Sequence, residues 1–311
     1  MKKALLMISS LMLILLAACC RDEEAIEKTS YGPIRFYGNV VDGFLTKAAD
    51  NYFVKQDSIG IFMIESGSQL SSTTILDGVN NYHYEALSTS ATPEFVPASP
   101  ADTIYYPTPA IPAFIAYYPA KDTVGPDFLL PIDLTGQATV ANIPPLDLLY
   151  SNNATDQTSN VVNLAFDHVL SYITFTIGAG TGLQPADLDG MSVTFNNVST
   201  TADFSLIDGT LQNQGPLTSS ISVPGKYYPA NKYAYFECLF LPNGSGSSST
   251  IEFLLADNKK FTYTIPTTQQ YLAGHIYNYK ITLSATAASI SGSVTTWAPG
   301  SLPNEGVITV N

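Results

Sequence analysis

Cysteine and histidine, which most often serve as nucleophiles and metal ligands, are scarce in this 311-residue chain. The three histidines, His83, His168 and His275, have no second histidine, cysteine or carboxylate at metal-ligand spacing. Cys19 and Cys20 are adjacent, so they lack the spacing of a CxxC redox or zinc motif. The sequence also lacks a Ser/His/Asp order with a nucleophile elbow. We therefore expect no enzyme activity, no catalytic residue, no metal site and no cofactor.

The segment before Cys19 indicates an attachment point instead. Two lysines precede an apolar run over residues 4–18, which is shorter than the ~20 residues of a membrane-spanning helix and is typical of an export signal. The tetrapeptide Leu16-Ala17-Ala18-Cys19 resembles a bacterial lipobox, in which the signal is removed and the cysteine thiol carries a diacylglycerol. We expect a lipoprotein signal peptide over residues 1–18 and a lipidated Cys19 that anchors the protein in a membrane. The alternative is an ordinary signal peptide with incidental cysteines.

Charge and composition limit the remaining functions. The formal net charge is −13, and loss of the two lysines of the signal gives −13 − 2 = −15, so we expect no nucleic-acid partner. Only 13% of residues are charged while 45% are hydrophobic, with 19 Tyr and 15 Phe, a composition typical of half-buried strands. Cys238 lies in an apolar run and is expected to be a buried residue, so no disulfide framework is predicted.

Short apolar and aromatic segments bounded by Gly, Pro, Asn and Asp predict an all-β protein built from β-sandwiches. The predicted strands are 33–41, 58–65, 81–87, 113–119, 171–177, 191–198, 202–208, 233–241, 249–256, 260–266 and 276–285. Asp257-Asn258 is expected to form a hairpin turn that pairs Phe253 and Leu255 with Phe261 and Tyr263. The polar segment 142–160, with its double proline, is predicted to connect two domains, 31–158 and 159–311.

The apolar alternation slips near Ser171. Leu164, Phe166 and His168 lie on one face of the predicted strand, whereas the apolar residues from Ile173 onwards have the opposite parity. This slip predicts a β-bulge or a bend. His168 is then expected to be a hydrogen-bonded group beside the bend rather than a catalytic base.

Several motifs, taken in order, carry a family resemblance that none of them carries alone. They are DSIGIFM (57–63), AYYP (116–119), FDHVLSYITF (166–175), YLAGHIYNYKITL (271–283), VTTWAP (294–299) and the lipobox. This set resembles the fimbrillin family of Bacteroidales, the Mfa-like lipoproteins that build type V pili. The resemblance implies two transthyretin-like Greek-key β-sandwich domains in tandem and a structural subunit of a cell-surface fimbrium for cell adhesion. The acidic tether over residues 19–30 also resembles a surface-export signal, with a solvated linker as the alternative.

The resemblance implies a processing site and a donor strand. Family members carry a basic residue between Thr and Ala after the first strand, and Thr46-Lys47-Ala48 matches with Lys for the usual Arg. We therefore expect a trypsin-like protease to cut after Lys47, which would remove the first strand, unless Lys47 is an ordinary surface lysine. Loss of the first strand would open an apolar groove in the N-terminal domain. The resemblance implies that C-terminal strands of another pilin subunit fill this groove, here around Val307, Ile308 and Val310 with 290–299 as a second strand.

Two alternatives remain open at the level of sequence. The terminal strand could stay in its own subunit, as in a tip subunit, and stalk, anchor and tip subunits all fit these motifs. Donation to the next subunit would give an open head-to-tail homo- or hetero-polymer. The second functional class is a surface glycan-binding lipoprotein, although Trp297 lies within the VTTWAP motif and is therefore expected to be structural.

Overall fold

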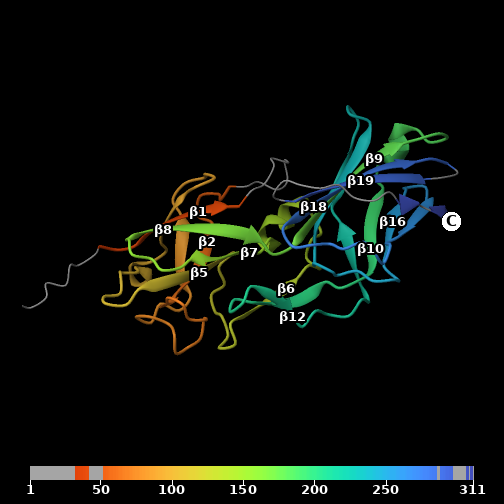
Figure 1. Ribbon diagram of the computed structural model, residues 1–311. Coiled ribbons are helices and arrows are strands. Elements are labelled where there is room, and N and C mark those ends of the chain that lie inside the picture. Colours follow the sequence, from red (N-terminus) through yellow and green to blue (C-terminus); the bar gives the residue numbers. More distant parts are fainter. Residues whose placement is uncertain (1–31, 42–51, 286–287, 297–305, 308, 311) are drawn as a thin grey trace, which may run out of the picture. The chain divides into compact units, whose positions relative to one another are not determined.

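The computed structural model describes residues 32–41, 52–285, 288–296, 306–307 and 309–310 (Figure 1). Strands dominate these residues, which confirms the predicted all-β class. The four helical segments are single 3-10 turns, Pro100–Asp102, Val140–Asn142, Pro144–Leu146 and Pro185–Leu188. Within the described part of the chain, no helix is both long and apolar enough to cross a membrane.

Seven N-terminal strands form a closed ring of hydrogen-bonded neighbours in the order β1-β4-β3-β2-β5-β7-β8. Their bounds are β1 (Arg35–Val40), β2 (Ser58–Glu65), β3 (Tyr82–Ala86), β4 (Glu94–Pro97), β5 (Pro112–Tyr118), β7 (Leu149–Ala154) and β8 (Val161–His168). β1 closes the ring because it pairs parallel to β8 and antiparallel to β4. The ring therefore has no free edge as long as β1 is in place.

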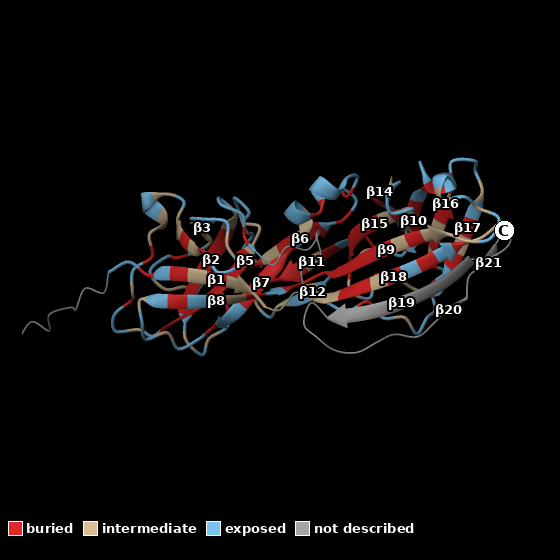
Figure 2. Ribbon diagram, turned by 90° about the horizontal axis from the view of Figure 1, so that it is seen from above, coloured by how far each residue is buried: buried red, intermediate tan, exposed pale blue. Residues whose placement is uncertain are grey.

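Alternating side chains fill the interior of this ring. Phe36 on β1 and Phe166 on β8 are fully buried, and their neighbours along each strand are more exposed (Figure 2). The ring of Phe36 packs edge-on against Tyr84 and Phe114, with centroid distances of 5.1 Å to each. Burial of large aromatic side chains is the main stabilising contribution here.

The C-terminal strands form two further sheets around a second core. One sheet has the order β14-β15-β9-β18-β19-β20 and the other β13-β10-β16-β17-β21. Aromatic rings such as Phe175, Phe195 and Phe253 pack in the core that these sheets share. The strands are β9 (Ser171–Ala179), β10 (Ser192–Val198), β13 (Ser219–Val223), β14 (Gly225–Tyr228), β15 (Tyr233–Phe240), β16 (Thr250–Leu254), β17 (Lys260–Thr264), β18 (His275–Leu283), β19 (Ala288–Thr296), β20 (Gly306–Val307) and β21 (Thr309–Val310).

A third, three-stranded sheet joins strands from both halves of the chain. Its order is β12-β11-β6, with β6 (Leu129–Asp133), β11 (Thr201–Ser205) and β12 (Thr210–Gln212). The side chain of Gln137 adds a further link, since its Nε2 donates to the carbonyl of Leu239 (3.0 Å) and its Oε1 accepts from the amide of Leu239 (2.6 Å). The amide group of Gln137 thus pairs with β15 as a neighbouring backbone would.

The predicted bend near Ser171 is confirmed. β8 ends at His168, and after Val169 and Leu170 the chain continues as β9 in a different sheet. Ile173 belongs to the C-terminal core, whereas Tyr172 belongs to the core around the three-stranded sheet. The change of parity in the sequence therefore marks the point where the chain passes from one sheet to another.

The segment 142–160 is not the polar connection that its composition predicts. β7 lies within it, with Leu149, Tyr150 and Ser151 buried, because these residues pair with β5 and β8. β8 follows the predicted boundary at residue 158 and pairs with β1, and β6 precedes it and pairs with β11. A strand after residue 158 therefore pairs within the N-terminal ring, and a strand before it pairs with one from the second half of the chain.

The hairpin predicted at Asp257-Asn258 is present, since β16 and β17 pair across it and Asn258 has φ = 70°. Phe253 lies opposite Phe261 as expected. Tyr263, however, lies opposite Ile251 rather than Leu255, because Leu255 lies beyond the end of β16 and its amide bonds to Lys259 in the turn.

Candidate functional site

The histidines have structural partners. His168 is buried, and its Nδ1 lies 3.0 Å from an oxygen of Asp147. His83 Nε2 is 3.1 Å from the carbonyl of Lys121, and His275 Nδ1 is 2.7 Å from the carbonyl of Ala273. Among the described residues, no group of three or more His, Cys, Asp or Glu side chains could hold a metal ion. The expectation of a hydrogen-bonded His168 beside the bend is confirmed.

Cys238 is fully buried, as predicted, and burial raises the pKa of its thiol above its usual value. A thiol with a raised pKa is a poor nucleophile, because the thiolate is the reactive form. Cys238 therefore contributes packing rather than chemistry.

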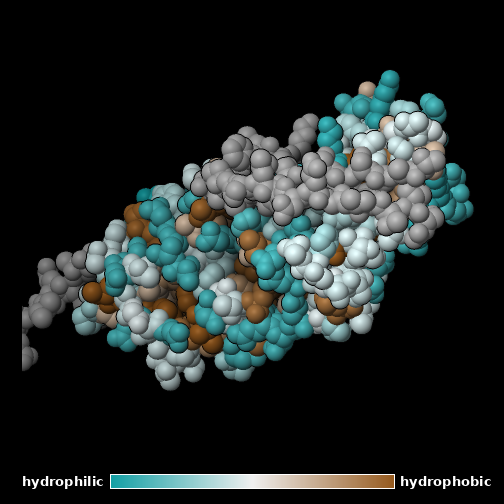
Figure 3. Space-filling view, turned by 45° about the vertical axis from the view of Figure 1, so that its right-hand side comes forward, coloured by the Kyte–Doolittle hydropathy of each residue, from teal (hydrophilic) through white to brown (hydrophobic). Residues whose placement is uncertain are grey.

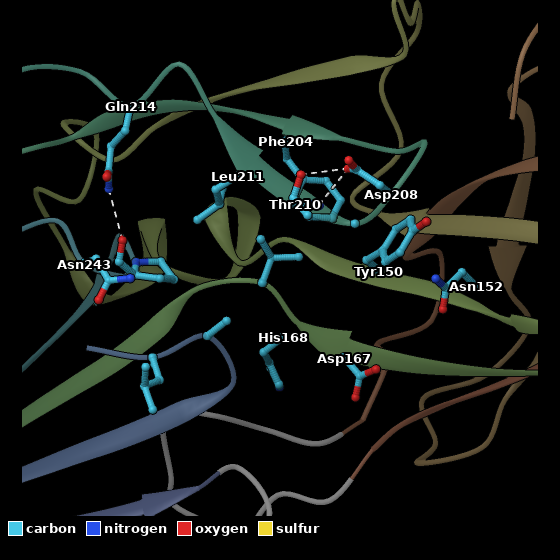
Figure 4. Close-up of a pocket in the computed structure, with 15 residues that line it drawn as sticks. Tyr150, Asn152, Asp167, His168, Phe204, Asp208, Thr210, Leu211, Gln214 and Asn243 are labelled. Carbon is cyan, nitrogen blue, oxygen red and sulfur yellow. Dashed lines mark hydrogen bonds between the residues drawn. The ribbon is translucent and has the colours of Figure 1, made fainter. Parts of the chain in front are cut away.

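A cavity of about 630 Å³ lies where β7 and β8 meet the β11–β12 hairpin (Figure 4). Several of its polar side chains already have hydrogen-bond partners within the protein. Asp208 accepts hydrogen bonds from the amide and hydroxyl of Thr210, which lower its carboxyl pKa, and Gln214 donates to the carbonyl of Pro242 at 3.1 Å. Burial raises the pKa of the Asp167 carboxyl. The lining combines carboxyl, amide and aromatic groups without a metal-ligand set.

The strand β1 is the second candidate site. It is the first described strand of the chain, and it pairs with a neighbour on each side in the N-terminal ring. Six residues pair in parallel register with β8, from Arg35 opposite Val161 to Val40 opposite Phe166. On the other side, Phe36 lies opposite Phe95 in β4, and the amide of Ile34 donates to the carbonyl of Ile104 at 2.8 Å. Removal of β1 would leave unpaired backbone groups on both flanking segments.

Glycine at position 38 makes room for two aromatic rings. A Cβ atom at Gly38 would lie 2.7 Å from a ring carbon of Phe95 and 3.1 Å from one of Phe166. Both rings pack edge-on against the buried ring of Phe53, with centroid distances of 5.1 and 5.4 Å. Both rings are buried, so a side chain at this position requires repacking of the core.

The outer face of β1 carries an exposed ion pair with β4. The guanidinium of Arg35 donates to both carboxylate oxygens of Glu94, at 2.9 and 3.0 Å, and also contacts the hydroxyl of Tyr37. The hydrogen bond from Arg35 lowers the pKa of the Glu94 carboxyl. An exposed pair of this kind contributes little to stability, so the inward side chains hold β1 in place.

The last strands of the chain lie at or next to the ends of their sheets. β19 pairs antiparallel with β18 over nine positions, from His275 opposite Thr296 to Leu283 opposite Ala288. β20 and β21 are short end strands, with Val307 opposite Ser289 of β19 and Val310 opposite Phe261 of β17. On the face in Figure 3, hydrophobic residues lie among hydrophilic ones. The exposed large apolar side chains of the described residues include Leu87 and Tyr105.

Comparison with known proteins identifies the family. The fimbrillin-like family matches residues 46–297. The chain belongs to the fimbrillin-like family. It is 27% identical over 309 residues to a Bacteroides uniformis protein named "Putative fimbrium subunit Fim1C", and the match covers 96% of this chain and 97% of that one.

Two solved structures have the same fold. A "putative cell adhesion protein" from Bacteroides uniformis has a TM-score of 0.69 at 25% identity, with 86% of this chain and 98% of that chain covered. Another from Bacteroides ovatus has a TM-score of 0.70 at 20% identity, with 88% and 100% covered. The family and these relatives are fimbrial and cell-adhesion proteins rather than enzymes, which confirms the functional class expected from the sequence.

The predicted site residues of this fimbrillin-like chain fall mostly outside the part that the structure describes. Cys19, Lys47 and Ile308 lie outside the described residues, and so does Trp297. Val307 and Val310 are described as backbone in β20 and β21. These predicted sites therefore stay predictions.

Sequence reasoning missed Gly38, where an added Cβ atom would lie 2.7 Å from the ring of Phe95. Its role depends on Phe95 and Phe166, which are distant in the sequence and meet only when the ring closes. A glycine at an inward position of an apolar strand was the only available signal, since glycine there marks a close approach.

Proposed function

We propose that this fimbrillin-like chain is a structural subunit of a cell-surface fimbrium and that it polymerises by exchange of β1 for a strand of another subunit. The family match supports the fimbrial role. The observation that carries the exchange is the position of β1, which joins β4 to β8 in the N-terminal ring and contributes Phe36 to its core. Loss of β1 would open an apolar groove flanked by unpaired strands, a site suited to strand addition.

The finer architecture of the proposal is two transthyretin-like Greek-key β-sandwich domains in tandem, for which the sequence predicts the bounds 31–158 and 159–311. The separate cores of the N-terminal ring and of the C-terminal sheets support two domains. The pairing of β8 with β1 supports a division closer to the bend at Val169 and Leu170 than to residue 158.

Export and anchoring form the first step of the proposed pathway. The signal peptide 1–18 is removed, Cys19 is acylated, and two or more acyl chains hold the precursor in the outer membrane. We expect mass spectrometry of the native N-terminal peptide to show lipid on Cys19. Cys19→Ala should release the protein from the membrane fraction, whereas the matched control Cys20→Ala should not. An unmodified N-terminal peptide would contradict the anchor.

Cleavage after Lys47 by a trypsin-like protease is the second step. Arg35 is a poor alternative, because it lies within β1 and its amide donates to the carbonyl of Asn160 at 2.8 Å. Limited trypsin digestion should cut first after Lys47. Lys232 and Lys259 lie in the turns of two β-hairpins and serve as internal controls. First cuts at these turns, with Lys47 intact, would count against the proposed site.

Donation is the third step, and the donor segment lies within the C-terminal strands. The sequence prediction centres on Val307, Ile308 and Val310, with residues 290–299 as a second strand. The positions of β20 and β21 at the ends of their sheets support this step, because short end strands detach most readily. The partners are then other pilin subunits in an open head-to-tail polymer.

Electron microscopy of the purified chain after trypsin treatment tests the proposed function. Filaments are the expected result. The second candidate, a glycan-binding surface lipoprotein, is favoured only by the cavity lined with Tyr150, Asn152 and Asp167. Monodisperse monomers that bind glycans after treatment would support the second candidate and contradict the first.

A further inference from the structure

The six-stranded C-terminal sheet has one face on its core and one face turned away from it. β14, β15, β9 and β18 lie side by side in this order (Figure 2). Ala234 and Phe236 of β15 belong to the buried core, so Tyr233 and Tyr235, which have the opposite parity, point to the other face. Both tyrosines are partly exposed. The outer face of this sheet therefore carries aromatic side chains that the core does not use.

Two residues of β14 stand on the same outer face. Tyr228 lies opposite Tyr233, and Lys226 lies opposite Tyr235. The rings of Tyr228 and Tyr233 have centroids 5.5 Å apart and are inclined by 32°. The ammonium of Lys226 lies 5.0 Å from the centroid of the Tyr228 ring. The two rings thus form one continuous aromatic surface with a cation beside it.

An open shelf borders this aromatic surface. Gly178 of β9 lies opposite Tyr233, and among the described residues a Cβ atom at Gly178 would have only the carbonyl of Ile281, at 3.9 Å, as a near neighbour. A glycine inside a strand often marks a place where a ligand approaches the backbone closely. One row along the sheet, the exposed Lys280 of β18 lies opposite Thr176 of β9. We call the following residues the tyrosine face: Lys226, Tyr228, Tyr233, Tyr235, Gly178 and Lys280.

The tyrosine face is cationic, although the chain has a formal net charge of −13. In β9, β14, β15, β18 and β19 the lysines are Lys226 and Lys280, and the only carboxyl side chain is that of Glu237. Glu237 is only 2% exposed, so its carboxyl group is not accessible to a ligand on the face. Charges further away are screened over ~8 Å at physiological ionic strength. The local charge of the face therefore favours an anionic ligand.

The surroundings of the tyrosines suit a sugar better than a protein. Thr176 and Thr282 flank Gly178 on the outer face, in rows that the register fixes, and both carry hydroxyl groups. Of the described residues with large exposed apolar side chains, none belongs to β9, β14, β15 or β18. A protein interface needs an apolar centre. A sugar instead packs its C–H face on an aromatic ring and exchanges hydrogen bonds with hydroxyl groups around it.

We propose that the tyrosine face binds an acidic polysaccharide, with sugar rings on Tyr228 and Tyr233 and carboxylate groups beside Lys226 and Lys280. The face would recur in every copy along a fimbrium, so weak single sites would add up to strong attachment. In that respect the inference rests on the proposed function and names the ligand class of its adhesive role. The binding itself needs no strand exchange, because one chain holds the whole face.

Calorimetric titration of the purified, uncut chain with defined oligosaccharides tests the proposal. The probes are hexasaccharides of galacturonic acid, hyaluronan and chondroitin sulfate. The methyl ester of the galacturonic acid hexasaccharide is the matched uncharged ligand, and hexaglutamate is an anion without sugar rings. At least one acidic hexasaccharide should bind, and the methyl ester and hexaglutamate should bind more weakly than the acidic sugars, because each lacks one of the two kinds of contact.

Variants of the tyrosine face locate the binding. Tyr228→Ala and Tyr233→Ala should each raise the Kd roughly 2- to 10-fold, the range expected for the loss of one aromatic contact. Lys226→Gln should raise it roughly 2- to 5-fold at low salt and less at high salt. The matched controls, Tyr105→Ala and Lys55→Gln, change exposed residues of the N-terminal half and should leave the Kd unchanged.

Gly178→Val tests the shelf without removing a contact. The new side chain should weaken binding, because it occupies the space beside Tyr233, and it should leave the thermal unfolding temperature nearly unchanged, because that space is open in the folded protein. If Gly178→Val and Tyr228→Ala are folded and bind as tightly as the parent, the proposal is wrong. If Asn152→Ala weakens binding instead, the ligand lies in the cavity beside β7.

The remaining outcomes separate this proposal from the proposed function. Failure of all three acidic hexasaccharides, or equal binding of the methyl ester or of hexaglutamate, contradicts the tyrosine face as a site for acidic sugars. Dimers of the uncut chain that Tyr228→Ala dissociates would show that a second copy covers the face. Filaments that form after protease treatment but do not bind these sugars overturn only the tyrosine face. Binding by a chain that forms no filaments after treatment supports the face and contradicts strand exchange.

Discussion

β1 and β19 have similar sequences and different surroundings. Each has a glycine with an apolar residue two positions away on either side, Gly38 in β1 and Gly292 in β19. β1 is a member of a closed ring, whereas β19 has β18 along one side and only the two residues of β20 on the other. The same type of strand is therefore enclosed in one region and near a sheet end in the other.

In the proposed exchange, this difference would explain why β1 is released only after a covalent cut, whereas an end strand detaches without one. Release of β1 breaks backbone pairing on both sides and exposes the surface that Phe36 covers, so spontaneous release costs much of the stability of the ring. Release of an end strand breaks pairing mainly along one side. In the proposed pathway, the loss of β1 after a protease cut would favour its replacement, because the open groove would be unstable.

Phe36→Ala should have the largest effect on the unfolding free energy among the variants of β1. The side chain is fully buried between Tyr84 and Phe114, so truncation should lower the unfolding free energy of the precursor by about 3–5 kcal/mol. Denaturant unfolding measures this change. The matched control Tyr37→Ala, on the outer side of β1, should cost about 1 kcal/mol. Equal losses for both variants would mean that the inner face does not hold the strand.

Gly38→Val should give the next largest effect. We expect a loss of about 1–3 kcal/mol in unfolding free energy, because the new side chain meets the rings of Phe95 and Phe166. In a Phe95→Ala background the loss should be smaller, and a double-mutant cycle by denaturant unfolding measures this coupling. Additive effects of the two substitutions would contradict the close approach at Gly38.

Much of the fold could be predicted from the sequence. The all-β class and the strands around Phe36, Phe62 and Phe253 follow from local alternation and turn residues, and the bend after His168 follows from a change of parity. Ring closure was not predictable, because the parallel pairing of β1 with β8 joins segments that are distant in the chain. β4 and β6 escaped notice because one is four residues long and the other contains Pro131.

The candidate site residues also fall into two groups, those that local motifs predict and those that depend on contacts between distant strands. Local motifs predict Cys19 and Lys47, because a lipobox and a Thr-basic-Ala context are contiguous in sequence. The restriction at Gly38 is a property of packing between strands, and the glycine itself is its only local signal. The cavity beside β7 likewise escaped prediction, since its lining comes from five separate stretches of chain, 150–152, 167–169, 204–214, 242–243 and 272–273.

Two carboxyl groups should give opposite pH dependences of the unfolding free energy. One is Glu237, in the sheet that contains β19, and the other is Glu94, in the N-terminal ring. Burial raises the pKa of Glu237, in the sheet that contains β19, above its usual 4.5, despite hydrogen bonds from Tyr172 and Tyr235. The folded state then holds this proton more tightly than the unfolded state, so the contribution is lost as pH rises from 4.5 through the folded pKa. Glu237→Gln should raise the unfolding free energy at pH 8 and have less effect at pH 4.

The control for Glu237 is Glu252→Gln, whose carboxylate is partly exposed and lies 2.6 Å from Lys260. Its effect at pH 8 should be small and should have the opposite sign, because an ion pair is lost. If Glu237→Gln lowers the unfolding free energy equally at pH 4 and pH 8, burial of the charge is not the dominant effect at that residue.

The ion pair beside β1 should have the smallest effect. Arg35 lowers the pKa of Glu94 below 4.5, so the stabilisation it gives is present above pH 4.5 and is lost as pH falls through the lowered folded pKa. Arg35→Gln should lower the unfolding free energy slightly at neutral pH, and salt should reduce the difference. Thermal unfolding at low and high salt measures it. A large, salt-independent loss would mean that the outer face, not Phe36, holds β1.

Electron microscopy of a reversibly locked β1 tests the central claim most directly. Tyr37→Cys with Glu94→Cys places cysteines on paired positions of β1 and β4, and Thr194→Cys with Ser222→Cys does the same on β10 and β13 as a control. Cys19 and Cys20 are replaced by alanine in all samples. After protease treatment, the oxidised β1 lock should give no filaments, reduction should restore them, and the control pair should give filaments in both states. Filaments from the oxidised lock, as abundant as after reduction, would show that assembly does not require β1 to leave its groove.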